Sequence, residues 1–178
     1  SLTTPSTTTD GHAGILVGNQ TKSHSIIRNC YVKGSVSGNK DFVGGIAGRQ
    51  FQSDAILTNC YSEADVTGGA SYVGGIVGRI YGGNASNCYA TGTIKGNSYV
   101  GGIAGDRYNN ATSIGFVAAN DTVLATTGFL GRAFGSIGTG ATVSNIYALE
   151  STIVELNGVS QSITSSSTGK DGESKSIA

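Results

Sequence analysis

The chain has 178 residues, enough for one domain with a sizeable core, and it contains 29 Gly, one Pro and no Trp or Met. Eleven basic and eleven acidic residues cancel, and the Lys and Arg are scattered, which excludes a basic surface for nucleic acid or for an anionic membrane. The apolar stretches are too short for a transmembrane helix. We therefore expect no nucleic-acid partner and no membrane insertion in this segment.

Both ends of the sequence differ in composition from the middle. Residues 1–10 are rich in Ser and Thr and hold the single Pro, and residues 159–178 are Ser-rich. Each end is predicted to be a linker or a cap. The lack of Met and the start at Ser1 suggest a segment of a larger protein, so we expect a signal or anchor, and the rest of the parent chain, to lie outside it.

A glycine-rich string recurs along the middle of the chain. It reads AGILVG at 13–18, VGGIAG at 43–48, VGGIVG at 73–78, VGGIAG at 100–105 and LGRAFG at 130–135. The glycines fall at i, i+1 and i+4, whereas a dinucleotide-binding loop needs them at i, i+2 and i+5, so a nucleotide site is excluded. We expect the paired glycines to form tight corners through backbone angles that other residues avoid. The pairs are Gly44, Gly45, Gly74, Gly75, Gly101 and Gly102.

A second string follows about a dozen residues after each glycine string. It reads NCYVKGSV at 29–36, NCYSEADV at 59–66 and NCYATGTI at 87–94, with weaker copies at 114–121 and 145–152. Its asparagines, Asn29, Asn59, Asn87 and Asn145, are predicted to form a structural ladder at a corner, although sugar or cation binding is an alternative. Its cysteines, Cys30, Cys60 and Cys88, are predicted to face inward as free thiols, with Gly115 and Ile146 continuing their column.

The two strings keep one period of 27–31 residues. Within each unit the second string alternates with period 2, which indicates a strand, and no window has the 3.6-residue apolar period of a helix. A unit of this length cannot bury its own apolar face, but stacked copies can. The sequence therefore predicts an all-β protein, a right-handed parallel β-helix (β-solenoid) of about five coils over residues 11–158.

Nearly every aromatic residue has a fixed place in the repeat. The outward column is predicted to contain Tyr31, Tyr61, Tyr89, Phe116 and Tyr147. Two further columns contain Phe42, Tyr72, Tyr99 and Phe129, and Phe51, Tyr81 and Tyr108. Rings at the strand spacing can stack on sugars or anchor a protein partner, but they can also pack only on each other. The first column is thus a candidate ligand-binding strip, with a packing ladder as the alternative.

The run NCYATGTIKGNSYVGGIAG resembles the GLUG-motif repeat of bacterial surface proteins, which include adhesin-like proteins and the non-catalytic region of IgA-specific metallopeptidases. The resemblance covers roughly residues 11–157. It implies an extracellular or cell-surface β-helical module for adhesion, display or spacing, with a host glycan or protein as the partner. An accessory segment of a larger secreted enzyme is the alternative.

Catalytic chemistry has little support in the sequence. The chain has only His12 and His24, neither in a His-Glu-x-x-His zinc motif, and an in-register cysteine column cannot converge on one metal ion. Glu63 and Asp65 share an outward face, as in polysaccharide-active β-helices, but their counterparts in other repeats are not acidic. We expect no catalytic residue, metal or cofactor, and keep a polysaccharide-active enzyme as a second alternative.

Overall fold

Short strands separated by sharp corners make up the regular structure of the described chain. The structure, a computed structural model, describes residues 2–4, 11–108 and 112–176. Within these residues no helix could span a membrane. Because the apolar and polar side chains alternate, each strand places one set inside the coil and the other set outside.

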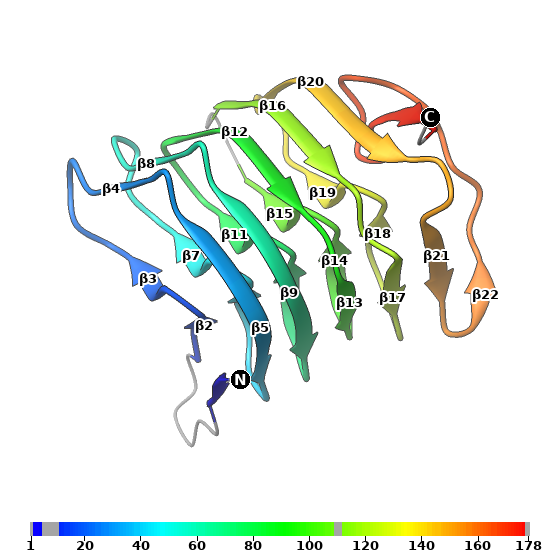
Figure 1. Cartoon of the computed structure of the whole chain (residues 1–178), viewed down its shortest axis with the longest axis horizontal. Coiled ribbons are helices and arrows are strands. Elements are labelled where there is room, and N and C mark those ends of the chain that lie inside the picture. The colour runs from blue at the N-terminus through cyan, green and yellow to red at the C-terminus, as the bar shows by residue number, and fades with distance from the viewer. Residues whose placement is uncertain (1, 5–10, 109–111, 177–178) are drawn as a thin grey trace.

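Five coils of four strands each are stacked along one axis (Figure 1). The first contains β2 (Ala13–Gly14), β3 (Val17–Gln20), β4 (Ile26–Arg28) and β5 (Tyr31–Gly38). The second contains β6 (Val43–Gly44), β7 (Ala47–Gln50), β8 (Ile56–Thr58) and β9 (Tyr61–Gly68). The third contains β10 (Ser71–Gly74), β11 (Val77–Ile80), β12 (Asn84–Ala90) and β13 (Thr93–Gly96). The fourth contains β14 (Ser98–Gly101), β15 (Ala104–Arg107), β16 (Thr112–Ala118) and β17 (Thr122–Ala125). The fifth contains β18 (Leu130–Gly131), β19 (Phe134–Ile137), β20 (Thr142–Leu149) and β21 (Ile153–Leu156).

Equivalent strands of successive coils pair in parallel and form three sheets. Sheet A is the wide sheet, of 13 strands, and includes the last two strands of every coil. Sheet B contains β2, β6, β10, β14 and β18, and sheet C contains β3, β7, β11, β15 and β19. The register is that of the sequence repeat: Val43 pairs with Val73, and Val73 with Val100. The predicted parallel β-solenoid of about five coils is confirmed.

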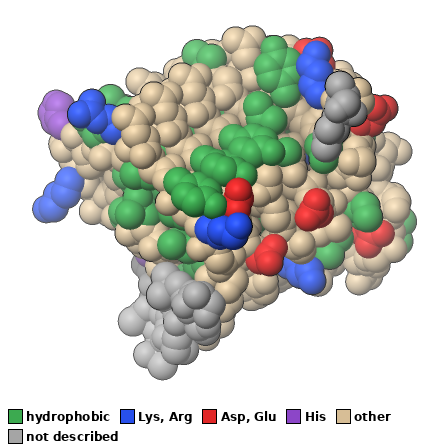
Figure 2. All heavy atoms as spheres, viewed as in Figure 1, with side chains coloured by type: hydrophobic (Ala, Val, Ile, Leu, Met, Phe, Trp, Pro, Cys, Tyr) green, Lys and Arg blue, Asp and Glu red, His purple; other side chains and the backbone are tan. Residues whose placement is uncertain are grey.

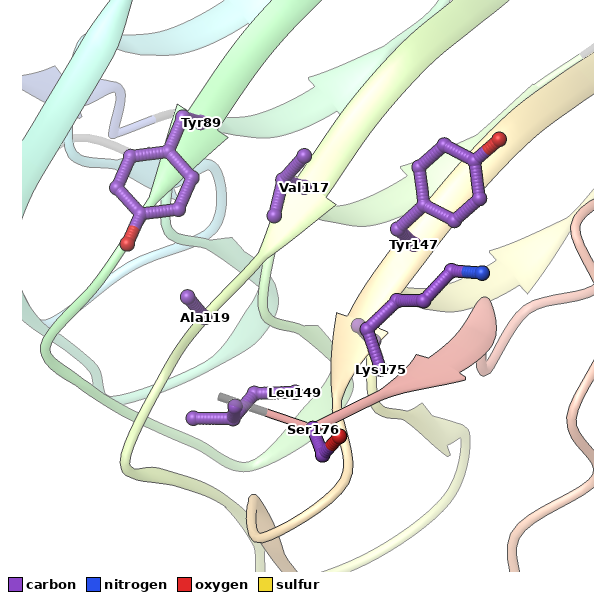
Figure 3. Close-up of a pocket in the computed structure, with 8 residues that line it drawn as sticks. Tyr89, Val117, Ala119, Tyr147, Leu149, Lys175 and Ser176 are labelled. Atoms are coloured by element: carbon purple, nitrogen blue, oxygen red, sulfur yellow. The ribbon is translucent and has the colours of Figure 1, made fainter. Parts of the chain in front are cut away.

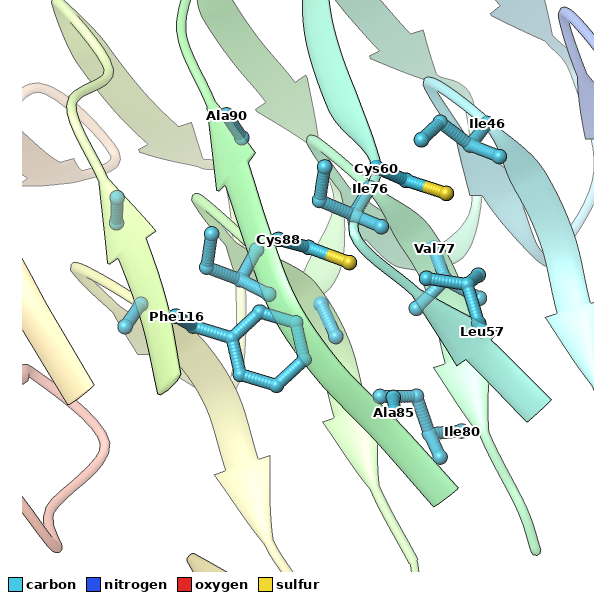
Figure 4. Packing of buried hydrophobic residues seen from close by; sticks show 14 of the residues in the cluster. Ile46, Leu57, Cys60, Ile76, Val77, Ile80, Ala85, Cys88, Ala90 and Phe116 are labelled. Carbon is cyan, nitrogen blue, oxygen red and sulfur yellow. The ribbon is translucent and has the colours of Figure 1, made fainter. Parts of the chain in front are cut away.

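The core is a set of inward columns that run along the axis. Val73, Ile76 and Ile94 in the third coil are fully buried, and their counterparts in the neighbouring coils lie above and below them. Each such side chain contributes about 1.5–3 kcal/mol through removal from water. Figure 4 shows Cys60 and Cys88 pointing into this core together with Ile46, Ile76 and Phe116. A single coil could not bury these faces, so the stack is the folding unit.

The paired glycines lie at the corner between sheets B and C, as predicted, but the expected reason is wrong. None of the six has a φ in the left-handed region. They are required because a Cβ has no room: one on Gly75 would collide with the carbonyl oxygen of Gly102, and one on Gly74 with the Cα of Ala104, both in the next coil. The neighbouring coil therefore approaches the corner backbone directly.

The two ends of the stack are covered differently. At the first coil, β1 (Leu2–Thr4) pairs with β5, while residues 5–10 of the predicted linker or cap lie outside the described residues. At the last coil, β22 (Val159–Ser160) returns antiparallel to β21, and β23 (Glu173–Lys175) pairs with β20. The backbone N–H groups of Ala133 and Phe134 donate to the carbonyl oxygen of Lys170. The C-terminal segment thus occupies part of the place of a sixth coil.

Candidate functional site

A column of tyrosines runs along the outer face of sheet A. The column, called here the tyrosine strip, contains Tyr31, Tyr61, Tyr89 and Tyr147, from β5, β9, β12 and β20. The ring centroids of Tyr31 and Tyr61 are 5.2 Å apart, and those of Tyr61 and Tyr89 are 4.8 Å apart. Figure 2 shows hydrophobic side chains gathered in a diagonal band across this face, with charged side chains around it.

The prediction that Phe116 belongs to this column is wrong. Phe116 is fully buried, pairs in register with Cys88 and Ile146, and contacts the ring of Phe134 edge-on at 6.0 Å. The residue that faces outward in the fourth coil is Val117, which pairs with Tyr89 and Tyr147. The strip therefore lacks a ring at one position.

Gly115 explains the displaced register. The prediction that Gly115 continues the cysteine column is wrong. Gly115 occupies the place of the asparagines, with a φ of 73° compared with 51° for Asn87. The asparagines Asn29, Asn59, Asn87 and Asn145 share this left-handed backbone, with φ between 51° and 54°. Asn and Gly are the residues that adopt this conformation most readily. The asparagines thus form the turn that aims the next residue inward.

Inward placement of the cysteine column is observed. Cys60 and Cys88 are buried, Cys30 is partly buried, and all three are free thiols. The hydrogen bond with Cys60, and then burial, raise the pKa of the Cys88 thiol. Among the described residues, no group of three or more His, Cys, Asp and Glu side chains is arranged to hold a metal ion.

One half of the tyrosine strip is tied to a carboxylate. The hydroxyl groups of Tyr31 and Tyr61 donate to Glu63 at 2.9 and 2.7 Å, and the Lys33 ammonium lies 2.8 Å from the same carboxylate. The hydrogen bonds from Lys33, Tyr61 and Tyr31 hold the pKa of Glu63 at about 2, below its ordinary value of 4.5. Both rings are therefore fixed at their faces and at their hydroxyl ends.

The other half of the strip contains a slot where the ladder skips a ring. Tyr89 and Tyr147 lie on either side of Val117, two strand spacings of about 4.8 Å apart (Figure 3). The cavity has a volume of about 450 Å³, with Ala119 and Leu149 extending its apolar floor. One ring of the ladder is therefore missing between Tyr89 and Tyr147, whose hydroxyl groups point in opposite directions in Figure 3.

Lys175 lies at the rim of the slot. Its ammonium group is 5.1 Å from the ring centroid of Tyr147 and 2.6 Å from a carboxylate oxygen of Glu173. Both residues belong to β23, which follows the last coil and lies outside the repeat. The repeat pattern gave no signal for this contact.

Comparisons with known proteins identify the repeat. The family model described as "The GLUG motif" matches residues 69–95, which cover most of the third coil. The chain carries the GLUG motif. A search of curated proteins finds no match to this GLUG solenoid.

A solved structure extends the likeness to the whole GLUG solenoid. It is described as a "putative immunoglobulin A1 protease from Bacteroides ovatus", with 28% sequence identity and a TM-score of 0.67. The match covers 92% of this chain and 55% of that chain. The GLUG solenoid therefore spans about half the length of that structure, and it resembles a region of an IgA-protease-like protein.

Proposed function

We propose that the GLUG solenoid is a non-enzymatic recognition module of a larger extracellular or cell-surface bacterial protein, and that it binds a partner through the slot in the tyrosine strip. The observation that carries this proposal is the replacement of one ring by Val117 in an otherwise stacked column. A ladder that served only to stabilise the sheet would be strongest without a gap.

The lining of the slot favours a protein partner that presents an aromatic side chain. Tyr89 and Tyr147 place one ring on each side of Val117, and the floor of Val117, Ala119 and Leu149 is apolar. An aromatic side chain would pack against one of these rings and bury its apolar surface on this floor. A sugar would place hydroxyl groups on the same floor, where those groups would lose water without gaining hydrogen bonds.

A titration with N-acetyl-tryptophanamide, followed by NMR, tests this function. The compound should shift the signals of Tyr89 and Tyr147 with millimolar affinity. Val117→Phe should abolish binding while raising stability by about 1 kcal/mol, because the added ring completes the ladder. Val117→Ala is the matched control, which leaves the slot open and should bind within about threefold of wild type. Equal binding by Val117→Phe would contradict the proposal, and binding of methyl glycosides instead would point to a glycan partner.

A second candidate role is that of an accessory segment in a larger secreted protease. The similarity to part of the Bacteroides ovatus structure favours it. The full-length gene distinguishes this role from that of an adhesin, because a His-Glu-x-x-His domain elsewhere in the chain is required for zinc proteolysis. Binding of purified immunoglobulin A1 to the isolated solenoid, measured by biolayer interferometry, would further support it.

A further inference from the structure

Sheet C has a polar row on its outer face that lies between two aromatic ladders. The row contains Asn19, Arg49, Arg79, Asp106 and Ser136, paired in register from β3 to β19. The corner ladder contains His12, Phe42, Tyr72, Tyr99 and Phe129, with centroids 4.6–5.0 Å apart. The short ladder contains Phe51, Tyr81 and Tyr108, each 5.0 Å from the next.

Arginine fills the space between the ladders in the second and third coils. The guanidinium carbon of Arg49 lies 4.3 Å from the ring centroid of Phe51. That of Arg79 lies 4.6 Å from Tyr72 and 4.5 Å from Tyr108, so its cation contacts both ladders. In these coils the guanidinium groups occupy the space between the two ladders.

The space opens in the fourth and fifth coils, where the polar row becomes shorter. Asp106 and Ser136 replace the arginines, and a cavity of about 430 Å³ lies between Tyr99 and Tyr108. This volume is within the range of about 300–1,000 Å³ that is typical of ligand pockets. Gly138 and Thr139 form its far side.

Tyr108 is the last ring of the short ladder, and its outer face borders this cavity. The backbone N–H of Gly138 donates to the carbonyl oxygen of Arg107, and in the coil before it the N–H of Tyr108 donates in the same way to the carbonyl oxygen of Ile80. Gly138 therefore occupies the position where the next ring of the short ladder would be. Tyr81 stacks on one face of Tyr108, and Gly138, the described residue in the next ladder position, has no side chain to stack on the other. An aromatic face beside polar groups is the arrangement on which a sugar ring stacks.

The floor of the cavity holds an acceptor and a donor of opposite charge. Arg79 Nε donates to Asp106 Oδ2 at 2.9 Å, and the two side chains are 15% and 5% exposed. Burial raises the pKa of Asp106, while Arg79 opposes that rise. Because the pair is neutral overall, it favours neither an anion nor a cation as ligand. Hydroxyl groups, which both donate and accept, match such a pair.

We propose that this pocket binds a neutral pyranose sugar, with its apolar face on Tyr108 and its hydroxyl groups on Asp106, Arg79 and Ser136. The site is independent of the slot in sheet A, since it lies on a different sheet and requires a different ligand. Its polar floor is the feature that distinguishes it from the apolar floor of the slot.

Saturation-transfer NMR with the methyl glycosides of glucose, galactose, N-acetylglucosamine and N-acetylgalactosamine tests the proposal. At least one should bind with millimolar affinity and show the strongest transfer on one face of its ring. Tyr108→Ala should weaken that binding about tenfold or more, and Ser136→Ala about threefold. Tyr89→Ala, in the slot of sheet A, is the control and should leave the sugar affinity unchanged.

Thermal melting of each variant shows whether it is folded, and Ser136→Ala keeps the test decisive if Tyr108→Ala unfolds. The proposal is overturned if none of the four glycosides binds at 50 mM, or if binding is insensitive to both variants at Tyr108 and Ser136. Binding of N-acetyl-tryptophanamide is measured separately, so failure of this site and failure of the slot give different results.

Discussion

The two halves of the tyrosine strip have the same scaffold and different surroundings. In the first half, Tyr31 and Tyr61 stack directly and share the Glu63 carboxylate. In the second half, Tyr89 and Tyr147 are separated by Val117 and face an open slot. The first half is thus held by ring stacking and by hydrogen bonds to a carboxylate, whereas in the second half the missing ring leaves a cavity between the two tyrosines.

Both halves of the strip depend on the glycine corner between sheets B and C, so a substitution that disrupts this corner should destabilise both of them. Gly75→Val should destabilise the protein by at least about 3 kcal/mol, because its side chain would collide with the backbone of the next coil. Ser71→Ala, at the start of β10 in the same coil, should change the free energy of unfolding by less than about 0.5 kcal/mol. Urea denaturation of the two variants provides the measurement, and equal midpoints would refute the packing role of the corner.

Truncating one ring in each half gives the most direct comparison. Tyr61→Ala should cost about 2–3 kcal/mol, since this ring stacks on Tyr31 and on Tyr89 and its hydroxyl bonds to Glu63. Tyr147→Ala should cost about 1 kcal/mol, because one face of its ring borders the slot. Denaturant melts of the pair measure both costs. A larger loss in Tyr147→Ala would mean that the second half is the structural one.

The smallest effect is a pH dependence of the first half alone. The pKa of Glu63 is about 2 when folded and has an ordinary value of 4.5, so its stabilising contribution is present above pH 4.5 and is lost as the pH falls towards 2. The melting temperature of wild type should exceed that of Glu63→Gln by a few degrees at pH 6, and this gap should narrow between pH 4.5 and 2. A constant gap over that range would show that the carboxylate charge does not support the strip.

The period of the repeat predicted the fold, since two strings in step specify both the length of a coil and the register of its neighbours. The inward cysteines and the outward tyrosines followed from the same alignment. The parallel register also places Lys33 and Glu63 opposite each other in adjacent strands.

The position of Phe116 and the pocket at Asp106 depend on features that the alternation of inward and outward residues along a strand does not predict. Phe116 was misplaced because Gly115 replaces an asparagine, and only their shared left-handed φ shows that they are equivalent. The preference of Asn and Gly for that conformation was the available signal. The pocket at Asp106 could not be derived from one column of the repeat. It combines a short side chain of the polar row, the last ring of the short ladder and rings of the corner ladder.

Arg132 has a consequence for the order in which the chain folds. Its buried guanidinium donates to the carbonyl oxygens of Asp171 and Gly172 and to the Ser174 hydroxyl, groups that lie 39, 40 and 42 residues later in the sequence. Until those residues arrive, closing the fifth coil would bury a cation without these acceptors. A chain that emerges from its N-terminal side can build four coils one after another, but the fifth is complete only once residues 171–174 have been made.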